Sequence, residues 1–434
     1  MSSREPAAAP AHRGVGVTAP ARRILEAALP ARLGPGFRWL LAASWITNLG
    51  DGIALAAGPL LVASQTDEAA LIAAAAFVQW LPPLLFALYA GALSDRLDRR
   101  LIVVTTDLLR AVILAVIAGS IVTGTVSIGL VLVALFLLGT AEVFADNTSA
   151  TLLPMLVRRD DLAVANARLQ AAFITVNQLA GPPIGAGLFA TGVAIPFIGQ
   201  AVLVAAGAVL VSRIVLPRPA RPTDRSRRLR HEIAEGVRWV RRHAAVGTLV
   251  LTIFTFNITF GAAWSVLVLY AAERLRLGEV GFGLVTTVSA AGGLLGTLSY
   301  GWITRRLSMG NIMRIGLIIE TLTHLGLALT TVPAVAMAIF FVFGAHAFVW
   351  GTTSITVRQR AVPSELQGRV TSVNTVGVYG GLVVGSALGG VLAQLLGVTA
   401  PFWFAFAGSG VFLVLIWRQL AHIAHADEAP LTSR

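Results

Sequence analysis

Ionisable side chains interrupt several of the long apolar runs in this sequence. Asp51 lies near the middle of one run, Glu320 and His324 lie four residues apart in a later run, and His346 lies in the next. Groups of this kind are costly to bury in an apolar segment and tend to face a cavity or a charged partner. Asp51 could therefore exchange a proton or bind a cationic substrate, and His324 could titrate near physiological pH.

Each of these groups also has a structural interpretation. Asp51 could be an acid that is permanently paired, with Arg110 as one candidate partner, and this interpretation stands beside the functional one. Asp107 and Arg110 are one helical turn apart, so we predict that they form a local pair. A lone histidine in an apolar helix is more often a hydrogen-bonded packing residue, and this applies to His324 and His346.

Other kinds of chemistry find no support in the sequence. No histidine or carboxylate cluster has the spacing of metal ligands, and no loop places a nucleophile beside a base. The chain has no cysteine, which excludes thiol catalysis and thiolate metal sites. It also has no lysine, which excludes a Walker-type phosphate loop. We therefore predict no enzyme activity, no catalytic residues, no metal and no cofactor.

The composition indicates which elements position these side chains. The 434 residues are 56% hydrophobic and only 12% charged, whereas soluble chains carry about 25% charged residues. A spanning helix takes roughly 20 residues, and the apolar windows predict an all-α membrane protein with twelve transmembrane helices. The predicted spans are 38–62, 70–92, 101–122, 127–147, 167–190, 193–215, 246–270, 281–303, 311–331, 333–355, 369–393 and 399–420.

The arginines predict the orientation of these spans. With both termini on one side, that side holds all arginines except Arg110, Arg274 and Arg276, and an excess of arginine marks the cytoplasmic side. We therefore expect both termini to be cytoplasmic in the inner membrane, and the net charge of +12 is then a topology signal rather than a sign of nucleic-acid binding. The predicted organisation is a flexible N-terminal tail (1–37), a six-helix bundle (38–215), a basic linker with an amphipathic helix (216–245), a second six-helix bundle (246–420) and a C-terminal tail (421–434).

The two predicted bundles repeat each other in sequence. Asp161-Leu162 and the later Gly181-Pro-Pro-Ile-Gly185 correspond to Glu365-Leu366 and Gly385-Ser-Ala-Leu-Gly389 at a constant offset. Two parallel six-helix repeats are typical of transporters whose substrate site lies between the halves. The linker adds an apolar face with Ile233, Val237 and Val240, which could lie on the membrane surface or belong to a solvated helix.

One short loop carries the most specific motif. Gly91-Ala-Leu-Ser-Asp95-Arg96-Leu-Asp98-Arg99-Arg100 separates the second and third predicted spans. Its pattern resembles the signature loop of the major facilitator superfamily, and the later loops resemble its branch of drug, macrolide and siderophore exporters. Asp98 departs from the glycine that is commoner at that position.

The resemblance implies a gate at this loop. Asp95 and Arg96 would latch the two halves together when the site faces outward, close to the start of the predicted span 369–393 at Arg369. Arg96 would pair with an acid at the cytoplasmic end of the predicted span 127–147, where Glu142 and Asp146 are expected. These two acids are further candidates for proton coupling. An ordinary turn with solvated charges is the alternative.

Glycines in the predicted spans 167–190 and 369–393 carry a second resemblance. Gly181, Pro182 and Gly185 resemble the Gly-Pro motif of the family's antiporters, which is associated with export. The span 369–393 has a small-residue stripe suited to close helix packing, made of Gly377, Gly381, Gly385 and Gly389. Static packing is the alternative role for both sets.

We predict a secondary transporter that works by alternating access. It would export a small, largely hydrophobic drug, antibiotic or secondary metabolite against an inward flow of protons. The predicted partners are this small molecule, protons and the lipid bilayer, with no nucleic acid. A siderophore or nutrient transporter of the same fold is the alternative, and a non-transporting receptor or assembly factor is a third hypothesis.

Overall fold

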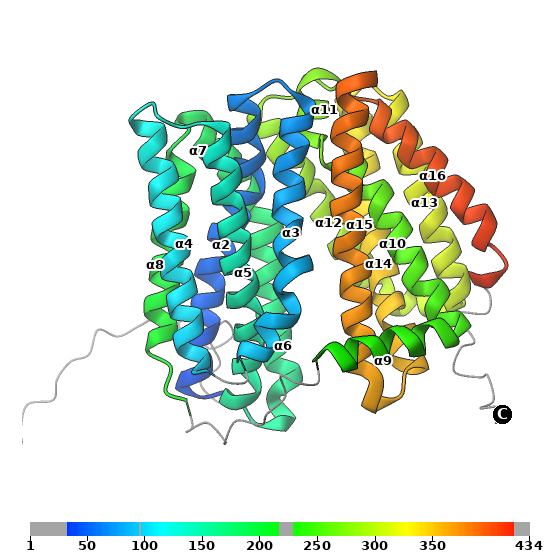
Figure 1. Cartoon of the computed structure of the whole chain (residues 1–434), viewed down its shortest axis with the longest axis horizontal. Coiled ribbons are helices and arrows are strands. Elements are labelled where there is room, and N and C mark those ends of the chain that lie inside the picture. Colours follow the sequence, from blue (N-terminus) through cyan, green and yellow to red (C-terminus); the bar gives the residue numbers. More distant parts are fainter. Residues whose placement is uncertain (1–32, 95–96, 217–228, 421–434) are drawn as a thin grey trace, which may run out of the picture.

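The computed structural model (Figure 1) describes residues 33–94, 97–216 and 229–420, and helices account for nearly all of these described residues. The predicted tails and the first part of the linker lie mostly outside these ranges. No strand occurs within the described ranges. The prediction of an all-α protein is confirmed.

Two groups of helices follow each other along the chain. The N-terminal half consists of α2 (Gly34–Gln65), α3 (Ala69–Ser94), α4 (Arg99–Val122), α5 (Ile128–Leu156), α6 (Leu162–Ala172), η3 (Phe173–Ala180), α7 (Gly181–Thr191) and α8 (Ile195–Ser212). The C-terminal half consists of α10 (Ala244–Trp264), α11 (Leu267–Glu273), α12 (Glu279–Arg306), α13 (Met309–Leu329), α14 (Pro333–Ala361), α15 (Gln367–Leu396) and α16 (Ala400–Ile416). Between the halves, α9 (Leu229–Arg242) lies across one end of the C-terminal half (Figure 1).

The helices match the predicted spans in number and order. Ten helices of the described chain are long and apolar enough to cross a membrane. The continuous segment α6–η3–α7 and the 17-residue α16 supply the two remaining crossings. Several helices are longer than predicted, because α5 continues to Leu156 and α14 to Ala361.

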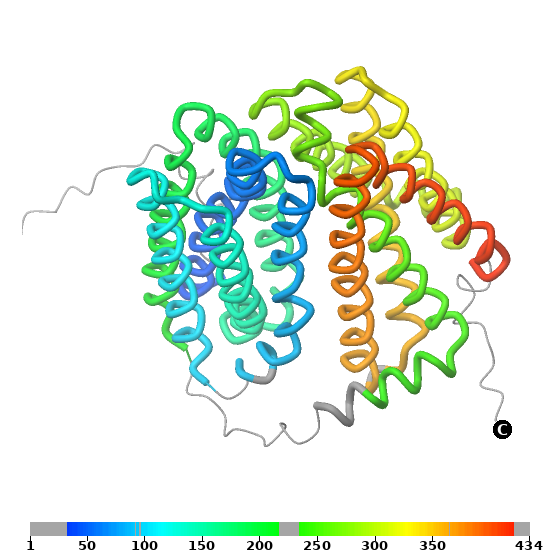
Figure 2. Tube along the Cα trace, turned by 45° about the horizontal axis from the view of Figure 1, so that its top comes forward, coloured from blue at the N-terminus to red at the C-terminus, as the bar shows by residue number. Residues whose placement is uncertain are grey.

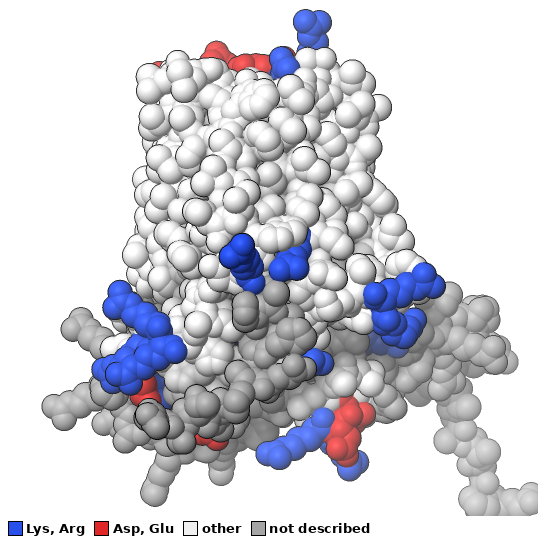
Figure 3. Space-filling view, turned by 90° about the vertical axis from the view of Figure 1, so that its right-hand side faces the viewer, with Lys and Arg blue, Asp and Glu red and all other residues white. Residues whose placement is uncertain are grey.

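The surface has the character of a membrane protein. In Figure 3 most charged side chains lie toward the two ends of the face shown, two basic side chains lie nearer its middle, and uncharged side chains cover most of the rest. Large apolar side chains such as Leu298 and Val414 are about three-quarters exposed. Such extensive apolar exposure is stable in contact with lipid chains rather than water. The chain is a multi-pass membrane protein.

Local sequence signals set the helix ends at the arginine-rich end of the molecule. Asp98 precedes α4 and its carboxylate accepts hydrogen bonds from the backbone N–H groups of Arg100 and Leu101. Ser308 caps α13 in the same way. An acceptor at this position satisfies backbone donors that the first helical turn leaves unpaired. The acid that departs from the family pattern in the signature loop therefore serves as a helix cap.

The halves meet along α3 and α15, which lie side by side in the two views (Figures 1 and 2). One apolar cluster joins both halves at the end remote from the arginines, with Ala73, Ala186, Phe282 and Ala393 among its members. Toward the arginine-rich end, the buried apolar clusters of the described residues each belong to a single half. The halves are therefore sealed together at one end.

The linker helix α9 is held by the C-terminal half. Val240 packs in a buried cluster with Val246, Val362 and Val370. Glu235 forms an ion pair of 2.8 Å with Arg369 at the start of α15. At Val240, the apolar face that the sequence predicted therefore lies against the C-terminal half of the protein.

Candidate functional site

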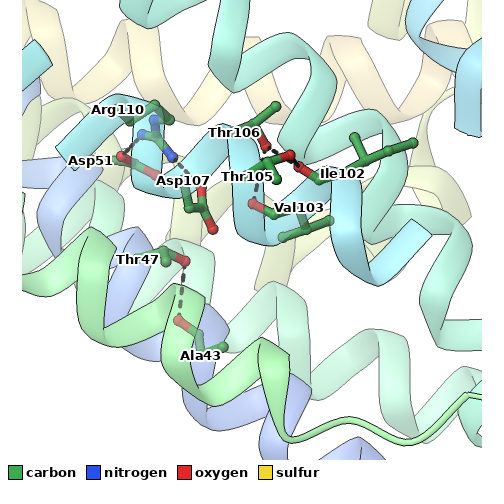
Figure 4. Close-up of polar contacts among 9 residues, drawn as sticks. All are labelled: Ala43, Thr47, Asp51, Ile102, Val103, Thr105, Thr106, Asp107 and Arg110. Carbon is green, nitrogen blue, oxygen red and sulfur yellow. Dashed lines mark hydrogen bonds and ion pairs between the residues drawn. The ribbon is translucent and has the colours of Figure 1, made fainter. Parts of the chain in front are cut away.

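Arg110 is at the centre of a charged cluster inside the N-terminal half. It projects from α4, its side chain is only 3% exposed, and its guanidinium forms ion pairs with Asp51 of α2 and with Asp107 of α4 (Figure 4). The pair with Asp107 measures 3.2 Å and joins neighbouring turns of one helix. Asp51 thus has Arg110 as its partner, as one interpretation of the sequence held, and the predicted local pair of Asp107 and Arg110 is observed.

Glu142 and Asp146 lie near the same charged group, and their predicted pairing with Arg96 stays a prediction because Arg96 lies outside the described residues. The prediction that they lie at the end of their helix was wrong, because α5 runs on for ten residues beyond Asp146 to Leu156. Both carboxyl groups lie within electrostatic reach of Arg110 and Asp51. Arg110 is therefore ion-paired with two carboxyl groups, and the two on α5 lie near enough to interact electrostatically with its charge.

The carboxyl groups on α5 face the C-terminal half. Tyr379 of α15 lies within electrostatic reach of both Asp146 and Glu142, and its ring lies 6.2 Å from that of Trp80 on α3. The side chain of Asp146 is exposed although it stands in the interior of a spanning helix. Asp146 therefore borders an accessible space where the two halves meet.

The titratable residues of the C-terminal half form a separate, aromatic site. His324 of α13 is fully buried with its ring 6.1 Å from that of Trp264, and His346 of α14 lies 5.3 Å from Phe343. The nitrogens of both histidines have no hydrogen-bond partner among the described residues. Glu320 is half-buried, and it forms no ion pair with His324 in the described part of the chain. The expected hydrogen bonds of these histidines are therefore not observed.

The gate residues are only partly described. Asp95 and Arg96 lie outside the described residues, so the predicted latch stays a prediction. Arg100 donates a hydrogen bond of 3.1 Å to the carbonyl of Ile214, just beyond the end of α8, which ties the loop to its own half. Arg369 is engaged by Glu235 of the linker helix, and a Cβ added at Gly91 would meet no atom of the described residues within 4 Å.

The glycine motifs bring helices into direct backbone contact. A Cβ at Gly185 would lie 2.2 Å from the carbonyl oxygen of Ile53 on α2, and one at Gly385 would lie 2.2 Å from that of Ile258 on α10. Gly181, Gly381 and Gly389 make equally close approaches to neighbouring helices. Gly377 differs, because its nearest neighbour would lie 3.6 Å away at Val250. The packing role of the stripe is therefore visible, and its association with export stays a prediction.

A π-helix before the Gly-Pro motif was not predicted. Residues Phe173–Ala180 form this wider turn beside α2, where the backbone of Asn177 contacts Gly52, the residue after Asp51. Pro183 has no N–H and cannot bond the carbonyl four residues earlier. Thr287 of α12 donates a hydrogen bond of 3.1 Å to that carbonyl, on Leu179. The proline thus frees the carbonyl oxygen of Leu179 to accept a hydrogen bond from the other half. In the sequence, the feature that marks this irregular segment is the Asn-Gln pair followed by two prolines.

No group of three or more potential metal ligands occurs among the described residues. The arrangement instead offers a buried cation with more carboxyl groups around it than it can pair. Such a cluster can bind protons or a cation and can change its charge when the halves move apart.

Known proteins resemble the chain over nearly its whole length. The family model of the Major Facilitator Superfamily matches residues 40–381. The chain is 28% identical over 387 residues to the multidrug efflux pump Tap of Mycolicibacterium fortuitum, covering 84% of this chain and 90% of that protein. It is 23% identical over 370 residues to macrolide efflux protein A of Streptococcus pyogenes, covering 81% and 87%.

The fold also resembles that of solved transporters. A bacterial homologue of the iron transporter ferroportin, in its inward-facing state, superposes with a TM-score of 0.72 at 16% identity, covering 89% of this chain and 98% of that one. At this identity the likeness concerns the fold. It extends over both six-helix halves.

Proposed function

The chain belongs to the Major Facilitator Superfamily, as its loop and glycine motifs predicted, and on this premise we propose that it exports a drug-like compound in exchange for protons. It is a transporter of small molecules rather than an enzyme. Its similarity to the multidrug pump Tap and to macrolide efflux protein A supports export of a small, largely hydrophobic compound.

The cluster around Arg110 is the observation that carries proton coupling. Arg110 forms ion pairs with Asp51 and Asp107. Neither Glu142 nor Asp146 forms an ion pair of its own within the described part of the chain. Several carboxylates around one guanidinium repel each other unless protons or a cation neutralise them. Because Asp146 borders the space between the halves, this neutralisation responds to which side of the membrane that space faces.

The inner membrane is the proposed location, with the arginine-rich end in the cytoplasm. The apolar cluster that joins the halves lies at the other end, which supports a cytoplasm-facing state of this structure. The bundles 38–215 and 246–420 then rock about the cluster as two bodies. In the outward-facing state the acids take protons, and in the inward-facing state they release them and favour substrate, since a ligand shifts such an equilibrium only through unequal affinity for the two states.

Export in a pump-deficient bacterial host tests this proposal. Cells that express the protein are challenged with a panel of hydrophobic antibiotics, and drug accumulation is measured with and without a protonophore. We expect the protein to lower accumulation, and the protonophore to abolish this effect. Export that persists after the proton gradient collapses would refute the coupling.

Variants of the two α5 acids connect the activity to the site. We expect Glu142→Gln and Asp146→Asn to raise accumulation to the level of cells without the protein. Asp67→Asn is the matched control, because Asp67 is an exposed acid in the loop between α2 and α3, and it should leave export unchanged. Uptake of the same compound into right-side-out vesicles, rather than inside-out ones, would indicate import instead.

A further inference from the structure

A groove on the C-terminal half has no part in the site between the halves. It lies between α12, α13 and α14 and has a volume of about 380 Å³. Its walls are almost wholly apolar, and wall residues such as Leu295, Ile315 and Val342 are two-fifths to one-half exposed on the surface that faces lipid. A groove of this size can take up the chain of an amphiphile directly from the bilayer.

Two glycines and two aromatic rings shape the interior of the groove. Gly296 lets α12 approach the backbone of α14, and a Cβ at Gly316 of α13 would lie 2.7 Å from the ring of Trp350. The indole nitrogen of Trp350 and both nitrogens of His346 have no hydrogen-bond partner among the described residues. These nitrogens are buried within the walls of the groove rather than open to its interior.

Positive charge lies at the mouth of the groove. Trp302 lines the groove near the end of α12, and the guanidinium of Arg306 lies over its ring at 4.6 Å. Arg305 is the neighbouring residue, and both arginines are exposed in the last turn of the helix. Paired arginines beside an interfacial tryptophan, at the level where phosphate groups lie, are complementary to an anionic headgroup.

We propose that this groove binds one anionic phospholipid, with its phosphate on Arg305 and Arg306 and an acyl chain between α12, α13 and α14. Trp350 lies opposite Gly316, seven residues into α13, which at a rise of 1.5 Å per residue is about 10 Å below the helix end. At that depth the ring of Trp350 is a wall against which an acyl chain packs. The charge at the mouth selects an anionic lipid over a zwitterionic one.

Native mass spectrometry of the purified full chain tests the proposal without any transport measurement. The detergent-solubilised protein is titrated with phosphatidylglycerol or with phosphatidylcholine of the same acyl chains. We expect one phosphatidylglycerol molecule to be retained in preference to phosphatidylcholine. Equal retention of the two lipids would overturn the choice of an anionic ligand.

Variants locate the bound lipid. We expect Arg305→Gln with Arg306→Gln to weaken phosphatidylglycerol binding about twenty-five-fold, from roughly fivefold for each arginine. Arg158→Gln with Arg159→Gln, an exposed pair in the other half, should leave binding unchanged. Ile315→Trp fills the groove from its lipid side and should also abolish retention.

Val411→Trp is the control for Ile315→Trp, because Val411 is exposed on α16 away from the groove. Both variants add an indole to the lipid-facing surface and should fold alike. Retention of the lipid by Ile315→Trp, or equal loss from both tryptophan variants, would overturn the assignment to this groove.

Discussion

Replacement of Arg110 should destabilise the N-terminal half more than replacement of any single acid around it. Arg110 is buried and forms ion pairs with two carboxylates. Arg110→Gln leaves both without their cation, and removal of one partner from a buried ion pair costs about 3–5 kcal/mol. Asp51→Asn leaves Arg110 paired with Asp107, so its cost is about 1.5–3 kcal/mol, the contribution of a hydrogen bond to a charged group.

A double-mutant cycle makes this prediction quantitative. The Asp51→Asn, Arg110→Gln double variant removes one of the carboxylates that the Arg110 variant leaves unpaired. Its free energy of unfolding should therefore exceed the additive value by about 2 kcal/mol, within the range found for residues in contact.

Unfolding in increasing SDS, followed by tryptophan fluorescence, measures these free energies in the purified protein. Arg213→Gln is the control, because Arg213 is exposed after α8, and it should change stability by less than about 0.5 kcal/mol. If Arg110→Gln were no more destabilising than this control, or if the cycle were additive, the assignment of Arg110 as the shared partner would be refuted.

Three further predictions concern helix contacts. Gly385→Ala should lower folded yield and transport, because the added methyl would overlap the backbone of α10, whereas Gly377→Ala should be tolerated in the same assays; equal effects would contradict the packing argument. Thr287→Val should destabilise the contact between the halves by about 0.5–1.5 kcal/mol, measured by SDS unfolding. Thr297→Val is the control, because its hydrogen bond lies within α12, and it should leave crosslinking between the halves unchanged. His243 caps α10 by accepting a hydrogen bond from a backbone N–H, and burial lowers the pKa of His243. The stabilising effect of this cap is therefore present above about pH 6.5 and is lost as the pH falls below that value, so hydrogen exchange of the first turn of α10 should speed up in acid. His243→Asn keeps a capping acceptor and should remove this pH dependence.

The number and order of the spans could be predicted because they depend on local composition. An apolar run of about 20 residues has to be a helix in lipid, where every backbone polar group needs an internal partner. The small-residue motifs likewise predicted close helix packing, since a larger side chain does not fit where Gly385 contacts Ile258. The repeat in sequence predicted two halves for the same reason, as each copy specifies the same local contacts.

Helix lengths and charge partners could not be predicted in the same way. Glu142 and Asp146 were placed at a helix end because the apolar run stops near them, but α5 continues to Leu156 through polar residues. Both acids therefore lie inside the helix rather than at its end, within electrostatic reach of Arg110.

The sequence by itself determined that this chain crosses the membrane many times, as two related bundles of one family. Only the tertiary structure decided that acids from α2 and α4 pair with one arginine while acids of α5 lie within its electrostatic reach, and that a threonine of the opposite half bonds the carbonyl freed by Pro183. The physical reason is the distance along the chain between the residues that interact. Insertion in a membrane depends on the hydrophobicity of each segment, whereas the charge of a buried carboxyl depends on side chains from distant segments that helix packing brings within a few ångströms.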